Sequence, residues 1–154
     1  MQYVHSDEAA LKHALELLEE AVKLVDEPNE MFDSWSQDVR ADILDKLWQR
    51  EAAVQCARSS LECRSIHSGY RNYSGYRHAE DRLVQILRGA CRPQEAEQVL
   101  RDGVNKRRAE FGDAHFSVNY ARLNLARALL QRKEHAEAEQ RVAARFMETY
   151  AGFA

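Results

Sequence analysis

The sequence predicts an all-α protein whose helices stack as hairpins in a right-handed superhelical solenoid. Three segments, 54–57, 96–99 and 138–141, recur at an offset of 42 residues, and the second and third both begin Ala-Glu-Gln. Such a period is typical of helical solenoids, in which one unit cannot bury its apolar face alone. Apolar residues recur at steps of three and four, as on amphipathic helices. Only six glycines and two prolines interrupt the 154 residues, and alternating β-branched runs are lacking.

The first predicted helix covers about residues 6–26 and forms a leading half repeat, 7–26. Ser6 is a good N-cap, Asp7 and Glu8 suit the positive end of the helix dipole, and Pro28 follows the end. Its apolar residues form one stripe: Ala14, Leu15, Leu18, Ala21, Val22 and Val25.

The first predicted hairpin covers residues 34–66. Its first helix begins at Ser34, with Gln37 three residues later completing a capping box. Its second helix begins near Glu51. The apolar faces of the two helices carry Val39, Ile43, Leu44, Leu47, Trp48, Val54, Ala57 and Leu61.

Two further hairpins follow, at 76–110 and 115–150, which gives seven helices in a single domain, 1–154. Pro93 lies where a proline is tolerated, in the first turn of a helix, and Gly112 ends that helix. Lys133 is expected in the turn of the last hairpin. The inward side chains of the helix before that turn are Val118, Ala121, Leu125, Ala126, Leu129 and Leu130.

The segments 96–104 and 111–115 resemble the second helix and the loop of a tetratricopeptide repeat. They are similar to the 42-residue variety found in kinesin light chains and many bacterial regulators. The segment 123–126, followed twelve residues later by Ala138-Glu139, continues the match. The resemblance is most complete over 83–142 and less complete over 43–66 and 7–26. The chain departs from the family where a turn usually holds glycine (Cys91, Lys133) and where a helix usually holds a small residue (Arg145).

The resemblance implies a non-catalytic scaffold that binds a peptide or helix of a partner protein in a concave groove. In this family the first helix of each hairpin lines the groove. The matching positions are His78, Arg82, Gln85, Tyr120, Asn124 and Arg127. The first hairpin offers Asp38, Asp42 and Asp45 at this surface, where a carboxylate clamp would need a basic residue. The implied partner is negative at one end and positive at the other.

A second candidate binding segment lies between the first two hairpins, where Ser-Gly-Tyr-Arg occurs twice. Glycine and serine predict a loop, and interleaved tyrosine and arginine are typical of interaction hot spots. The candidates are Tyr70, Arg71, Tyr73 and Tyr76. The alternative is that the tyrosines cover the ends of the hairpins and the arginines are solvated.

Catalytic and cofactor motifs are lacking, so we expect no enzyme, no catalytic residues and no cofactor. Cys56, Cys63 and His67 lie at steps of seven and four, which would place them on one helix face. A zinc site needs three or four ligands in a tetrahedron, and no fourth spacing points there. We therefore expect no metal, with Cys56 as a structural thiol.

Charge and cysteine usage predict a cytoplasmic protein that binds neither membrane nor nucleic acid. The three cysteines show no CxxC spacing, and neither a signal peptide nor an apolar span is present. Residues 1–51 carry 13 acidic and 5 basic side chains, a balance of −8, and the rest carries 12 and 17, a balance of +5. This asymmetry reflects either a solvated surface or one that steers a charged partner. The basic residues are dispersed rather than clustered.

The alternative function is a structural oligomerisation unit that makes contact through its end faces. The last predicted helix offers more apolar residues than one stripe can bury: Phe146, Met147, Tyr150 and Phe153. We expect a second copy, a partner, or the next segment of a longer chain to cover them. The competing possibility is that the tail from Ala151 folds back over them.

Overall fold

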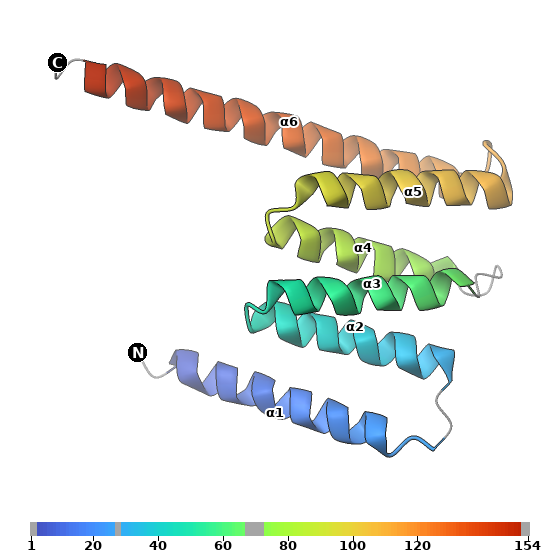
Figure 1. The fold of residues 1–154 in the computed structure, drawn as a ribbon. Coiled ribbons are helices and arrows are strands. Elements are labelled where there is room, and N and C mark those ends of the chain that lie inside the picture. The colour runs from blue at the N-terminus through green and yellow to red at the C-terminus, as the bar shows by residue number, and fades with distance from the viewer. Residues whose placement is uncertain (1–2, 27–28, 67–72, 152–154) are drawn as a thin grey trace. The chain divides into compact units, whose positions relative to one another are not determined.

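The computed structural model describes residues 3–26, 29–66 and 73–151. Among them it contains six helices and no strand (Figure 1), which confirms the all-α prediction. The chain forms two compact units, 1–96 and 97–154, and each is described by itself. The helices are α1 (Tyr3–Lys23), α2 (Glu30–Lys46), α3 (Arg50–Ile66), α4 (Tyr73–Gly89), α5 (Pro93–Phe111) and α6 (Phe116–Ala151). The superhelix and the single domain stay predictions.

The helices of the first unit lie side by side in chain order (Figure 1). Helix α3 packs against both α2 and α4, α2 also touches α4, and α1 packs on α2. None of the described α1 side chains is fully buried, so the core lies among the other three helices. Its buried apolar residues are Ala41, Ile43, Leu44, Ala53, Val54, Ala57, Ala79, Leu83, Val84, Ile86 and Leu87.

The first two helices begin earlier than predicted. Helix α1 already runs through Ser6, so Ser6 is not its cap. Helix α2 is capped by Asn29, whose Oδ1 accepts a hydrogen bond of 2.7 Å from the Phe32 N–H. Ser34 and Ser36 lie inside α2, where their hydroxyls donate to backbone carbonyls one turn back. The capping box predicted at Ser34 is therefore wrong, because an earlier asparagine provides an equally good acceptor.

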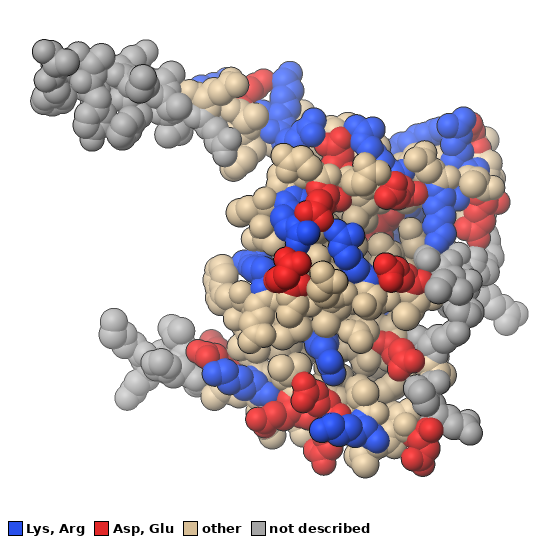
Figure 2. Space-filling view, in the orientation of Figure 1, with Lys and Arg blue, Asp and Glu red and all other residues tan. Residues whose placement is uncertain are grey.

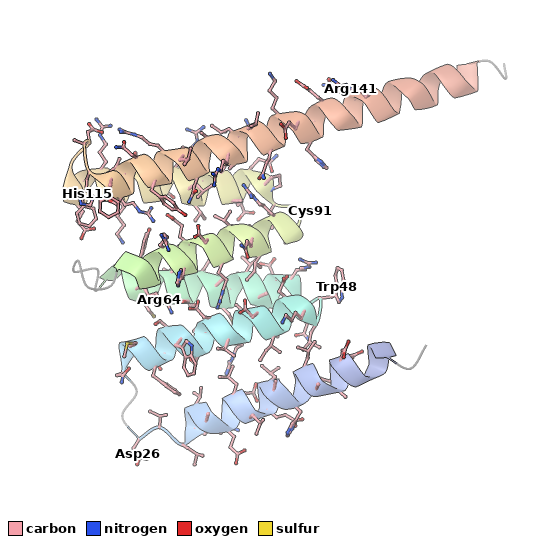
Figure 3. The ribbon with its side chains drawn as sticks, turned by 180° about the vertical axis from the view of Figure 1, so that it is seen from behind. Asp26, Trp48, Arg64, Cys91, His115 and Arg141 are labelled. Carbon is pink, nitrogen blue, oxygen red and sulfur yellow. The ribbon has the colours of Figure 1, made fainter. Side chains whose placement is uncertain are left out.

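The two hairpin turns of this unit have the same backbone geometry. Trp48 and Cys91 adopt φ values of +62° and +59°, in the left-handed region that favours glycine. The N–H groups of each turn repeat the same pattern of acceptors: Trp48 to Asp45, Gln49 to Leu44, Cys91 to Arg88 and Arg92 to Leu87. Figure 3 shows Trp48 and Cys91 at these hairpin ends. Trp48 was predicted on the apolar stripe of its helix, but α2 stops at Lys46 and Trp48 is 78% exposed.

The turns also correct the repeat length between the first two hairpins. Equivalent hydrogen bonds lie 43 residues apart, as do the first residues of α2 and α4 and of α3 and α5. The predicted offset of 42 aligned Val54 with Ala96, whereas the turns align Ala53 with Ala96, and both of these alanines are buried. The offset of 42 therefore misplaces this pair by one residue.

Cys91→Gly should raise the free energy of unfolding by about 1 kcal/mol, because a residue other than glycine costs about 1–2 kcal/mol in the left-handed region. The Cys91 side chain is exposed, so its removal deletes little packing. Urea unfolding followed by circular dichroism measures the change. Cys91→Ala is the control: it keeps a Cβ at positive φ and should gain nothing. Equal stabilities of the glycine and alanine variants would contradict the assigned backbone strain.

The second unit contains most of α5 and all of α6. Helix α5 begins at Pro93 as predicted, and Gly112, with φ +80°, follows its end. The hairpin predicted at 115–150 is wrong: α6 is one continuous helix of 36 residues (Figure 1). Residues 131–140 are mostly strong helix formers, so nothing at Lys133 stops the helix. None of the helices in the described ranges is long and apolar enough to cross a bilayer.

Candidate protein-interaction surfaces

Asp38 forms a buried hub between α2, α3 and α4. Ser60 Oγ donates to one carboxylate oxygen at 2.7 Å, and the Arg64 guanidinium donates to the other at 2.5 Å. Arg64 also donates to the Gly75 carbonyl at 2.7 Å, which ties α3 to the start of α4. Asp38 was predicted to lie on the groove surface, but it is buried. Its role is therefore to join three helices rather than to meet a partner.

Arg82 of α4, predicted to line the groove, links α4 to the exposed side of α2. Its Nη2 lies 3.2 Å from Asp42 Oδ2, and its Nη1 lies 3.7 Å from Asp38 Oδ1. Burial raises the pKa of the Asp42 carboxyl, while the positive charge of Arg82 opposes that shift. The Asp42 side chain remains about half exposed. The ion pair holds Arg82 against α2 and leaves part of the Asp42 side chain exposed to solvent.

The ion pair between Arg82 and Asp42 shows which side of α4 and which side of α2 lie next to each other at the protein surface. On α4, His78 and Gln85 lie four and three residues from Arg82 and are exposed. That they line a groove stays a prediction. On α2, Met31 and Trp35 lie eleven and seven residues before Asp42, which puts them on the same side of that helix. Met31 is exposed and Trp35 is 59% exposed.

We call this surface the α2–α4 face; it comprises Met31, Trp35, Asp42, His78 and Gln85. Sequence reasoning missed Trp35 because the tryptophan had been placed in a capping box. Its spacing of four from Met31 and seven from Asp42 is the signal that could have found it.

The aromatic segment before α4 is described only in part. Tyr70 and Arg71 lie outside the described residues, as does the side chain of Tyr73. Tyr76 is buried. Its burial leaves little of the Tyr76 side chain for a partner to contact. The alternative, that the tyrosines cover the ends of the hairpins, stays a prediction.

In the second unit, Tyr120 and Arg127 lie on one exposed side of α6, whereas Asn124 is half-buried. Three exposed apolar side chains share that side: Phe116 (61% exposed), Leu123 (50%) and Leu130 (56%). Phe116, Tyr120, Leu123, Arg127 and Leu130, together with Glu134, form a row of exposed side chains that we call the α6 stripe. Leu130 was predicted to point inward, so its exposure corrects that assignment. The prediction that α4 and α6 residues line a common groove stays a prediction.

Side chains of the loop between α5 and α6 contact Phe116, the first residue of the α6 stripe. The His115 ring stacks on Phe111 with centroids 4.7 Å apart, and it packs on Phe116 at 4.6 Å. Asp113 accepts hydrogen bonds from Arg108 of α5 and Arg122 of α6. These contacts connect the end of α5 to the start of α6, where Phe116 lies.

The described residues show no cluster of side chains that could hold a metal ion. Cys56 and Cys63 lie half-buried on α3, while His67 lies outside the described residues. Burial raises the pKa of the Cys56 thiol, while the positive charge of Arg40 opposes that shift. In Figure 2, acidic and basic side chains are interspersed along α1, without a patch of one sign on the visible face.

No family model, curated protein or solved structure matches the chain. The tetratricopeptide assignment therefore stays a prediction that rests on the segments 96–104, 111–115 and 123–126.

Proposed function

We propose that this protein is a non-catalytic interaction scaffold that binds a peptide or helix of a partner protein on the α2–α4 face. The exposed Trp35 carries the proposal, because it shares that face with a half-exposed carboxylate on Asp42. The proposal includes a tetratricopeptide-like right-handed superhelix and a cytoplasmic location. It assigns the protein neither a catalytic role nor a cofactor.

The chemistry of the face favours a partner segment that contains arginine or lysine. Trp35 and Asp42 are two helical turns apart, about 10.5 Å along the axis. A cationic side chain can lie over an indole ring or form a charge-assisted hydrogen bond with a carboxylate. The excess of acidic residues in 1–51 adds long-range attraction for such a segment.

Met31 and Gln85 extend the face with adaptable contacts. Methionine is flexible and polarisable, so it can follow different partner surfaces. The exposed amide of Gln85 can pair with a partner's backbone, and His78 adds a second polar side chain on α4. Tryptophan is enriched among the residues that dominate binding energy.

Selection of a random 12-residue peptide library against the purified chain provides a probe for this face. We expect the selected peptides to be rich in arginine and lysine, and Trp35→Ser to weaken their binding at least tenfold. Trp48→Ser is the matched control, because Trp48 is also exposed but lies on the hairpin turn outside the face. Fluorescence anisotropy of labelled peptides measures both affinities.

A library that yields no binder would contradict the proposal. So would peptides whose affinity is unchanged by Trp35→Ser, or lowered equally by Trp48→Ser. Circular dichroism should show that both variants keep the helical content of the unmodified chain, since neither ring is buried.

A further inference from the structure

Two leucines of the α1 segment are exposed to solvent. Leu17 and Leu24 are both more than half exposed. They are seven residues apart, two helical turns, and the Leu24 N–H donates to the Glu20 carbonyl at 3.1 Å, so Leu24 continues the helical path beyond Lys23. Leu17 precedes the half-buried Leu18, which packs on α2, by one position, about 100° around the helix axis. The two leucines therefore form a row beside the packed side of α1.

The α2 residues of the α2–α4 face lie in the same way beside the side of α2 that packs on α1. Ser36 and Ile43 are buried, and they lie across α2 from Asp38, two residues before it and five after it. Because Asp38 points to α3, Ser36 and Ile43 lie on the side where α1 packs. Trp35 and Asp42 each precede one of these two residues by one position, again about 100° around the axis.

These two rows lie on the same side of the first unit. Helices α1 and α2 run antiparallel, with the C-terminal half of α1 beside α2 (Figure 1). A two-fold axis perpendicular to an antiparallel pair exchanges its helices, so rows rotated in the same direction from the contact share one side of the pair. Leu17 and Leu24 therefore extend the surface that Met31 and Trp35 begin, and we call these four exposed residues the apolar patch.

Acidic side chains accompany the apolar patch. Glu20 is exposed and lies three residues after Leu17 and four before Leu24, on their side of α1. Asp42 of the α2–α4 face keeps about half of its side chain exposed. The exposed Lys46 lies one turn beyond Asp42, at the end of α2. A ligand on the apolar patch therefore meets carboxylates on both helices.

We infer that the partner segment is a basic amphipathic helix, whose apolar side packs on the apolar patch and whose lysine or arginine residues pair with Glu20 and Asp42. This inference rests on the proposed function and extends its site onto α1. An amphipathic helix binds an apolar surface through residues spaced three, four and seven apart, and its charged residues border that side. A second copy of the same patch fits less well, because residues 1–51 carry a balance of −8 and two copies would repel each other.

A fluorescent 18-residue peptide of leucine and lysine, with its leucines at steps of three and four, tests the inference on the full chain. We expect fluorescence anisotropy to show binding, and Leu17→Ser/Leu24→Ser to weaken it at least tenfold. Leu123→Ser/Leu130→Ser is the matched control, because these leucines are also exposed but lie on α6. A second peptide, with glutamate in place of every lysine, should bind at least tenfold more weakly, because it opposes like charges to Glu20 and Asp42.

A leucine–lysine peptide that does not bind overturns the inference, as does equal binding of the lysine and glutamate peptides. An affinity that Leu17→Ser/Leu24→Ser leaves unchanged, or that the α6 control lowers equally, overturns it too. If sedimentation velocity shows that the unmodified chain dimerises and the Leu17→Ser/Leu24→Ser variant does not, a second copy covers the patch and the inference is wrong.

Failure of this inference and failure of the scaffold proposal can be told apart. The scaffold proposal stands if the selected 12-residue peptides depend on Trp35, even where the leucine–lysine peptide ignores the changes on α1. Circular dichroism should show that Leu17→Ser/Leu24→Ser keeps the helical content of the unmodified chain, since neither leucine is buried.

Discussion

Asp38→Ala should lower the free energy of unfolding by about 3–5 kcal/mol, the loss typical of a buried ion pair broken by removing one partner. Without the carboxylate, the largely buried guanidinium of Arg64 loses its counter-ion. The buried hydroxyl of Ser60 also loses its acceptor. The contact between α2 and α3 and the Arg64 link to the start of α4 both depend on this group.

Urea unfolding followed by circular dichroism measures this loss. Asp42→Asn is the matched control on the same helix: Asp42 also pairs with Arg82, but its side chain is about half exposed. We expect that change to alter stability by less than about 1 kcal/mol, as for a partly solvated pair. Equal effects of the two substitutions would contradict the role of Asp38 as a hub.

Leu87→Ala should lower the free energy of unfolding by about 2–5 kcal/mol, because Leu87 is 0% exposed and its truncation leaves a cavity. Leu44 occupies the equivalent place 43 residues earlier and is also buried. Leu44→Ala should therefore cost a similar amount. Thermal and urea unfolding of both variants, with exposed Leu24→Ala as the control, measure the effect. A Leu87 variant as stable as the control would contradict the packing.

The sequence predicted the all-α class and two of the helix ends well, because apolar periodicity reports directly which side of a helix is buried. Helix α3 ends at Ile66 and α5 begins at Pro93, as expected. Helix ends set by one hydrogen bond were harder to predict. Asn29 and Ser34 are both good caps by residue type, and in the structure Asn29 caps α2.

Sequence alone also left α6 and the candidate surfaces incomplete. A turn at Lys133 came from the repeat length, yet local propensity there favours a continuous helix. Arg82 and Asp42 were expected on one surface, and the structure places them 3.2 Å apart. Periodicity gives the side of a helix a residue lies on but not its pairing, so the burial of neighbouring Asp38 could not be foreseen.

Because the two hairpin turns share one backbone geometry, they are places where a helical pair could be inserted into the chain or deleted from it. Each turn closes with the same backbone hydrogen bonds whether a tryptophan or a cysteine holds its left-handed position. A copy of residues 49–91 spliced in after Cys91 would therefore meet an equivalent junction at both ends. The protein could be lengthened by one helical pair without designing a new connection, and shortened by the reverse deletion.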